Sequence, residues 1–200
     1  MRERRARVEE HTRARILAVA AEQFGREGYA ATSVRDIARS VGVLGAIYAH
    51  FPSKGRLLVA VYEEGARRIG RAVDTAVARA GGPWKQLGAA AAHLQMLLAN
   101  GAFARGTVRV LPEDVPEVAR DVRRLREGYE ARFRRLIRAL DLAPDVDRTL
   151  LRVMLLGALN ATQVSFKRAA GRADAAAIAR QFVATLRSGA RPPREGHGLG

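Results

Sequence analysis

The sequence predicts an all-α protein of about nine helices. Ala, Leu, Arg and Glu, all strong helix formers, are abundant along the 200 residues. Apolar residues recur at three- and four-residue steps, which is the helical period, whereas runs that alternate with the period of a strand are few. Hydrophobic residues make up 48% of the chain, enough for a buried core rather than a disordered chain.

Composition also excludes several classes of protein. No apolar run approaches the roughly 18 residues of a membrane-spanning helix. The basic start, Met1-Arg-Glu-Arg-Arg-Ala-Arg-Val-Glu-Glu10, leads into further charges instead of the apolar segment of a signal peptide. We therefore expect a soluble, cytoplasmic protein without a membrane partner. The absence of cysteine excludes disulfides, thiolate metal sites and cysteine nucleophiles.

The formal net charge of +15 favours polyanionic partners such as nucleic acid, an anionic membrane surface or phosphorylated metabolites. Residues 1–60 carry 11 Lys and Arg against 6 Asp and Glu, and residues 61–200 carry 24 against 14. Because the excess is spread along the chain, charge alone does not locate the face that binds the partner.

The first helix is expected to begin near Glu10–Arg13, after a basic flexible arm over residues 1–9. Gly28 is suited to a left-handed cap at its C-terminal end. Apolar residues on one side of this segment form its predicted buried face: Ile16, Leu17, Ala20 and Phe24.

Two short helices follow. Ser33 and Asp36 resemble a capping box that opens a helix ending at Gly42. Another short apolar helix ends in Tyr48-Ala-His-Phe51, before Pro52-Ser-Lys54 breaks the chain. This spacing predicts a three-helix head with a helix-turn-helix over residues 10–53. Its predicted anchors, which also contact Ile16 and Phe24, are Val34, Ile37, Ala38, Val41, Val43, Ile47 and Phe51.

The remaining helices form a larger predicted domain over residues 54–189. Ser53 is placed to cap a long helix from Lys54 to Ala80, and Gly81-Gly-Pro83 separates this helix from the next. Pro112 and Pro116 precede an Arg-rich helix, Pro144-Asp-Val-Asp147 begins an apolar one, and Asp174 is placed to cap the last. The Pro- and Gly-rich residues 190–200 are expected to be disordered.

Several segments resemble the TetR family of bacterial regulators. They are Thr12-Arg-Ala-Arg-Ile-Leu17, Phe24-Gly-Arg-Glu-Gly-Tyr29, Thr32-Ser-Val-Arg-Asp-Ile-Ala38 and Ile47-Tyr-Ala-His-Phe-Pro-Ser-Lys54. The resemblance implies a homodimeric repressor that binds a palindromic double-stranded DNA operator. Residue by residue, it implies phosphate contacts at Thr32, Ser33, Tyr48, His50 and Lys54, and base contacts at Arg35, Leu44, Gly45, Ala46 and Tyr48. It also suggests that Arg2, Arg4, Arg5 and Arg7 reach the minor groove.

The turn before the recognition helix departs from the family pattern. Gly42-Val-Leu-Gly-Ala-Ile-Tyr48 is one residue shorter than usual, and Leu44 stands where a hydroxyl cap is expected. Loss of such a cap costs about 1 kcal/mol. Since Ile47 and Phe51 keep their spacing to Lys54, we expect the turn, not the anchoring of the helix, to absorb the shortening. The alternative is weaker or re-registered DNA binding.

The second domain resembles, more loosely, the branch of the family that senses acyl-CoA thioesters. Leu155-Leu-Gly-Ala-Leu-Asn-Ala-Thr162 and Ile178-Ala-Arg-Gln-Phe182 carry this resemblance, although Ala161 replaces the usual Trp. It implies a small-molecule inducer, with an acyl-CoA as one candidate. The predicted ligand-binding residues are His93, Leu97, Phe103, Arg109, Tyr129, Phe133, Asn160 and Gln163. Arginines at 105, 109, 123, 124, 132, 134 and 135 are candidates for CoA phosphates, or simply a solvated helix face.

The last two helices resemble the dimerising pair of the family. Gly157, Ala158 and Ala161 permit close helix approach, although packing within one chain explains them as well. No enzyme, metal or cofactor is predicted, because the four histidines are scattered and no nucleophile elbow or phosphate loop is present. The alternative function is a basic architectural protein that binds DNA without sequence preference.

Overall fold

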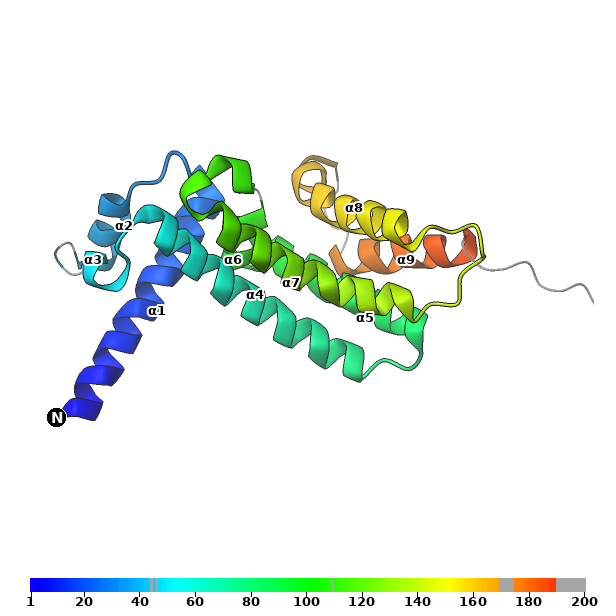
Figure 1. Ribbon diagram of the computed structural model, residues 1–200, viewed down its shortest axis with the longest axis horizontal. Helices are drawn as coiled ribbons and strands as arrows, with labels where there is room; N and C mark the ends of the chain where they lie inside the picture. The colour runs from blue at the N-terminus through cyan, green and yellow to red at the C-terminus, as the bar shows by residue number, and fades with distance from the viewer. Residues whose placement is uncertain (44, 46, 109, 170–174, 190–200) are drawn as a thin grey trace, which may run out of the picture. The chain divides into compact units, whose positions relative to one another are not determined.

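The structure, a computed structural model, describes residues 1–43, 45, 47–108, 110–169 and 175–189. In these residues the secondary structure is entirely helical, which confirms the predicted all-α class (Figure 1). None of the helices described is long and apolar enough to span a membrane. The helices are α1 (Arg2–Glu27), α2 (Val34–Val41), α3 (Ile47–His50), α4 (Lys54–Ala78), α5 (Pro83–Asn100), α6 (Ala102–Val108), α7 (Ala119–Arg138), α8 (Arg148–Ala169) and α9 (Ala175–Gly189), with two 3-10 turns, η1 (Pro112–Asp114) and η2 (Pro116–Val118).

The chain packs as two compact units. The first comprises Met1–Gly70 and Leu97–Tyr129, and the second comprises Arg71–Met96 and Glu130–Gly200, of which 170–174 and 190–200 are not described. The helices α4, α5 and α7 contribute residues to both units. The predicted functional boundary at residues 53–54 therefore falls within the first packing unit.

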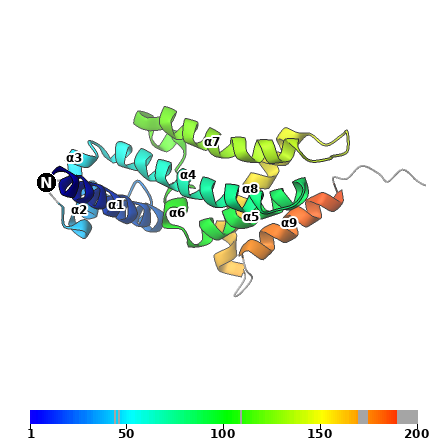
Figure 2. The same cartoon turned by 90° about the horizontal axis from the view of Figure 1, so that it is seen from below.

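In the first unit, α2 and α3 lie against α1 (Figure 2). One continuous core joins the helix-turn-helix to the start of α4, because Leu57, Leu58 and Val61 are completely buried in the same cluster as Ile16 and Ile37. Burying such aliphatic side chains stabilises the fold by about 1.5–3 kcal/mol each. The first turns of α4 thus share one core with the predicted helix-turn-helix.

The start of α1 corrects one prediction. The helix begins at Arg2, so a separate flexible arm over residues 1–9 and a helix start near Glu10–Arg13 were wrong. The physical reason is the composition of the segment: Arg, Glu and Ala are good helix formers, and no Gly or Pro interrupts them before Gly25. The predicted end of the helix at Gly28 is confirmed, since its amide donates to Phe24 O at 3.1 Å. The left-handed cap expected there is wrong, because Gly28 has a positive φ of 91° but an extended ψ of 155°.

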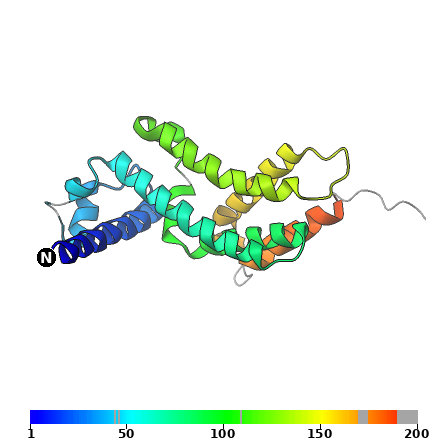
Figure 3. The ribbon, with the colours of Figure 1, turned by 60° about the horizontal axis from the view of Figure 1, so that its bottom comes forward.

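The second unit is a helical layer in which α9 runs along α5 (Figure 3). Its core contains large side chains that are almost fully buried, and Gln95 Nε2 donates to the carbonyl oxygen of Leu159 within this core. The apolar helix expected after Pro144-Asp-Val-Asp147 is present as α8, and Asp147 caps it, because its Oδ1 accepts from the amides of Thr149 at 2.6 Å and Leu150 at 3.0 Å. Asp174, predicted to cap α9, and the predicted disordered tail lie outside the described residues.

Candidate DNA-binding site

The start of α2 is fixed by Ser33. Its Oγ accepts a hydrogen bond from the amide of Asp36 at 3.1 Å, which is the N-cap half of the predicted capping box. The Asp36 carboxylate, however, accepts from the Ser33 hydroxyl at 2.5 Å, whereas a complete box has it accept from the Ser33 amide. The same carboxylate pairs with Arg39 at 2.9 Å. At the other end Gly42 is left-handed, with φ 76°, and closes the helix by donating to Ala38 O and Arg39 O. Local sequence thus determines both ends of this helix.

The recognition helix α3 is short but well anchored. Its described residues are Ile47–His50, with Ile47 fully buried and Phe51, directly after it, almost so. The amide of Val43 donates to Ala38 O at 2.9 Å and that of Ile47 to Val43 O at 3.2 Å, so the turn is tied to both helices. The anchors therefore keep their expected burial while α3 is reduced to about one turn. Leu44 and Ala46, predicted to face bases, lie outside the described residues.

The outer face of the motif carries several of the predicted DNA contacts. Arg35, Gly45 and Tyr48 are exposed, and Tyr48 exposes 58% of its surface. His50 is half-buried, with its ring 6.4 Å from that of Phe51. An exposed guanidinium and phenol beside a glycine suit contacts to phosphates and base edges.

Thr32 is placed differently from the other predicted contacts. Its side chain is buried, with 1% of its surface exposed, and its Oγ1 donates to Gly28 O at 2.8 Å. Its amide also donates to Gly28 O, at 3.3 Å. The hydroxyl predicted to grip a phosphate therefore stabilises the turn between α1 and α2 instead.

Lys54 is held by the residues that follow α1. Its Nζ donates to Ala30 O at 3.2 Å and lies 4.3 Å from the centre of the Tyr29 ring, a cation–π contact. Burial lowers the pKa of Lys54, and the nearby Glu117 carboxylate partly opposes this shift. The predicted phosphate-binding ammonium is thus already in contact with protein groups.

Tyr29 links this lysine to the 3-10 turn η2. Its phenol donates to Glu117 Oε1 at 3.2 Å. Burial, together with the Glu117 carboxylate, raises the pKa of Tyr29 to about 12, so the phenol remains protonated at neutral pH. Neither Tyr29 nor Glu117 was predicted as a site residue, although Tyr29 falls within one of the segments that resemble the family.

The predicted ligand-binding residues are spread over both units. Leu97, Phe103 and Tyr129 belong to the first, where the Arg68 guanidinium lies 4.4 Å from the Phe103 ring centre. His93, Phe133 and Asn160 belong to the second, with Phe133 fully buried. Arg109 and the side chain of Gln163 lie outside the described residues, as does the side chain of Arg105 among the predicted CoA-binding arginines. Two other arginines of that set form ion pairs: Arg124 with Asp121 and Arg132 with Asp74.

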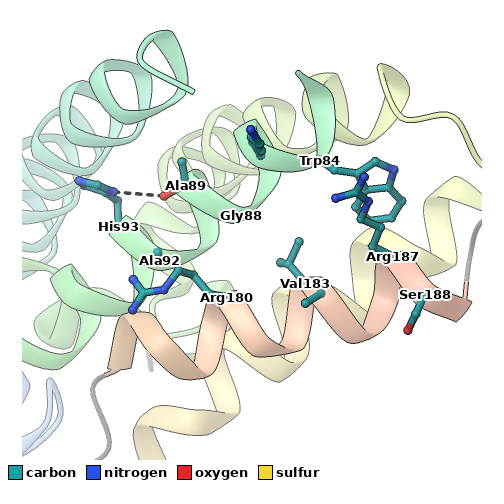
Figure 4. A pocket seen from close by; sticks show the side chains of 11 residues that line it. Trp84, Gly88, Ala89, Ala92, His93, Arg180, Val183, Arg187 and Ser188 are labelled. Carbon is teal, nitrogen blue, oxygen red and sulfur yellow. Dashed lines mark hydrogen bonds between the residues drawn. The ribbon is translucent and has the colours of Figure 1, made fainter. Parts of the chain in front are cut away.

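A groove that the sequence did not predict lies between α5 and α9 in the second unit (Figure 4). Of the predicted ligand residues it contains His93, whose ring is oriented by a 3.1 Å hydrogen bond from Nδ1 to Ala89 O. Among the described residues, no group of three or more His, Asp or Glu side chains is arranged to hold a metal ion. The candidate site with polar and basic side chains on its surface is therefore the exposed face of the helix-turn-helix, which buried residues anchor to the core.

These features define a helix-turn-helix protein with an additional helical region. Comparison with family models gives the same result: residues 16–61 match the bacterial regulatory proteins of the TetR family, and residues 81–190 match the tetracyclin repressor-like C-terminal domain. The chain belongs to the TetR family of transcriptional regulators. A comparison with curated proteins finds no match.

Solved structures share the fold. A TetR-family regulatory protein from Rhodococcus RHA1 is 26% identical, with a TM-score of 0.76 over 90% of this chain and 97% of that one. AibR in complex with isovaleryl coenzyme A and operator DNA is 23% identical, with a TM-score of 0.73 over 87% and 97% of the chains. FadR from Bacillus subtilis in complex with stearoyl-CoA is 22% identical, with a TM-score of 0.73 over 88% and 98%.

Proposed function

We propose that this regulator is a repressor that binds a palindromic operator through α2 and α3 and releases it when a small molecule binds the helical region. The observation that carries the proposal is the division of the motif into a buried side, with Ile37 and Ile47 fully enclosed, and an exposed side with Arg35 and Tyr48. Rigid anchoring with a free outer face is what entry into the major groove requires. The charge of +15 favours association with DNA.

We propose phosphate or base contacts for residues on the exposed side. Arg35, Gly45, Tyr48 and His50 are placed for such contacts, and Ser33 can contribute while it caps α2. Lys54 reaches a phosphate if its ammonium leaves Ala30 O. Functionally, residues 10–53 are the DNA-binding part and 54–189 the sensing and dimerising part, even though the packing units divide the chain differently.

Dimerisation through α8 and α9 is supported by an apolar face left exposed on α8. Leu150, Val153 and Met154 expose 60%, 55% and 62% of their surfaces, and Gly157 and Ala161 extend the same face at helical spacing. Contiguous exposed apolar side chains on a folded unit mark interaction surfaces. In a two-fold symmetric dimer, the partner subunit presents the same apolar face, and contact between the two faces buries them. Two heads then meet successive major grooves about 34–36 Å apart.

For the inducer, the proposed class is an acyl-CoA thioester. The likeness to AibR and FadR, each solved with a CoA thioester, supports this class, as does the partial motif around Asn160. Asn160 and His93 are half-buried polar groups, which suits a pocket that orients a ligand.

Fluorescence-anisotropy binding to the DNA upstream of the gene, with scrambled DNA as the reference, tests the repressor proposal. A specific complex that one acyl-CoA dissociates supports the whole proposal. Equal affinity for both DNAs with a steep salt dependence favours the architectural alternative. Specific binding that no thioester affects retains the repressor and rejects the CoA inducer.

Paired variants separate contact residues from fold. Tyr48→Ala should weaken operator binding by at least about five-fold, since a lost contact at the DNA surface costs about 1–3 kcal/mol. Leu111→Ala, which also truncates an exposed side chain but lies outside the motif, should leave operator affinity unchanged.

The dimer proposal has its own pair of variants. Met154→Asp should convert the dimer to monomers in light scattering, whereas Leu111→Asp should not. Loss of dimerisation by Tyr48→Ala would contradict the assignment of roles.

A further inference from the structure

The groove between α5 and α9 has the size of a small-molecule binding site. It is open to solvent, has a volume of about 740 Å³ and lies wholly within the second unit, and this volume is in the range of small-molecule sites. Its floor is made of small apolar residues, and a Cβ on Gly88 would still stand 3.9 Å from Val183 Cγ1. The lining residues are Trp84, Lys85, Gly88, Ala89, Ala92, His93, Arg180, Val183, Ala184, Arg187 and Ser188.

Basic groups stand at both ends of this floor. Lys85 lies one residue after Trp84 at the start of α5. Arg187 lies near the end of α9 (Figure 4). His93 and Arg180 line the other end. At 1.5 Å per residue, Lys85 and His93 are about 12 Å apart along α5. No carboxylate is among the described lining residues, so an anion in the groove meets attraction from either end.

We propose that this groove binds an amphipathic anion, a molecule with an apolar chain or ring system and a carboxylate or phosphate group. The apolar part lies over Gly88, Ala92 and Val183, and the anionic part meets Lys85 and Arg187. This site goes beyond the inducer residues proposed above and shares only His93 with them. A second copy of the chain is the competing occupant, because α9 also belongs to the proposed dimerising pair, and the titration below separates the two.

Trp84 makes the proposal directly measurable, because it is the one tryptophan of the sequence and it lines the groove. The full-length protein is titrated with decanoate, decanoyl-CoA and the neutral decanol while Trp84 emission is recorded. A saturable change with either anion, at least about ten-fold tighter than with decanol, supports the proposal, since about 1.4 kcal/mol of charge-assisted bonding corresponds to that ratio. Decanoate alone identifies a free carboxylate, and decanoyl-CoA alone identifies a phosphate-bearing ligand.

Three variants locate the site. Lys85→Gln combined with Arg187→Gln should raise the dissociation constant of the anion at least about ten-fold, because both cationic partners are removed. Gly88→Leu should abolish the emission change by filling the floor of the groove. Arg79→Gln removes an exposed cation of the same unit outside the groove and should leave binding unchanged.

Several outcomes overturn the proposal. The first is equal affinity for decanol and for the anions, and the second is an unchanged dissociation constant of the anion in the double variant. The third is a Trp84 emission that changes with protein concentration but with neither anion, because this result assigns the groove to a second copy of the chain. Operator binding is measured in parallel on the same variants. Groove binding without operator binding rejects the repressor proposal alone. Release of the operator by a thioester in Gly88→Leu, in which the groove is filled, supports a groove that is separate from the inducer site.

Discussion

The contact between α6 and α1 predicts a measurable effect of one methyl group. Gly106 on α6 approaches the backbone of α1 so closely that a Cβ at this position would lie 2.6 Å from Ala21 O and 3.3 Å from Ala21 C and Cα. All three neighbours are backbone atoms inside a continuous helix, which cannot rotate away as a flexible side chain can. Gly106→Ala therefore requires the two helices to separate.

The size of the effect follows from that distance. Ordinary contact begins near 3.4 Å, so the two backbones must part by about 0.8 Å. Overpacking costs about 1–3 kcal/mol, and the rigid neighbours place this case at the upper end. Alanine regains about 1 kcal/mol of helix propensity. The net loss of about 2 kcal/mol should lower Tm by roughly 4–8 °C for a chain of this size.

Thermal unfolding followed by circular dichroism measures this change. Gly128→Ala is the matched control, because Gly128 is also helical but nothing lies within 4 Å of its Cβ position. Gly128→Ala should gain only the higher helix propensity of alanine, about 1 kcal/mol, and should raise Tm by about 2–4 °C. If Gly106→Ala melts at or above the wild-type temperature, the close approach of α6 to α1 is not a constraint and the reasoning fails.

Three other perturbations have definite expected outcomes. Tyr62→Phe removes the buried hydroxyl that bonds two carbonyl oxygens at the end of α6, at 2.5 and 2.7 Å, and should cost about 1–2 kcal/mol in chemical denaturation. The pKa of Tyr29 is raised to about 12, so the native state retains a proton that the unfolded state releases near pH 10. The free energy of unfolding should therefore fall as the pH rises from about 10 to about 12. In Tyr29→Phe the free energy of unfolding should fall less over the same pH range. Ser33→Ala should cost about 1 kcal/mol of thermal stability, and unchanged stability would contradict the capping role. Ser33→Asp keeps the cap, but it should weaken operator binding because the added carboxylate repels the DNA phosphates.

Much of the fold could be predicted because its determinants are local. Ser53 caps its helix, Gly28 and Gly42 end theirs, and α8 begins after Asp147, as the sequence indicates. The start of α1 could not be located in this way, because residues 2–9 contain no cap, Gly or Pro, and only helix propensity distinguishes an arm from a helix.

The site was only partly predictable, because exposure depends on tertiary contacts. Spacing along the chain identified Arg35 and Tyr48 as exposed. Thr32 was placed with them as a DNA contact, but its side chain is buried and its hydroxyl donates to Gly28 O. The α5–α9 groove joins residues about a hundred positions apart, so no local motif marks it. One available signal was the pairing of Trp84 with Lys85 ahead of a run of small residues.

The lysine held beside Tyr29 has a thermodynamic consequence for the protein as a DNA-binding regulator. A phosphate that recruits the ammonium of Lys54 competes with Ala30 O and with the Tyr29 ring, and its negative charge is repelled by the neighbouring Glu117. By linkage, a perturbation that loosens Tyr29 from η2 changes the affinity of Lys54 for phosphate, and occupation of Lys54 changes the stability of η2 by the same free energy. If Lys54 binds a phosphate as proposed, the DNA backbone and the residues that follow α1 compete for the same ammonium.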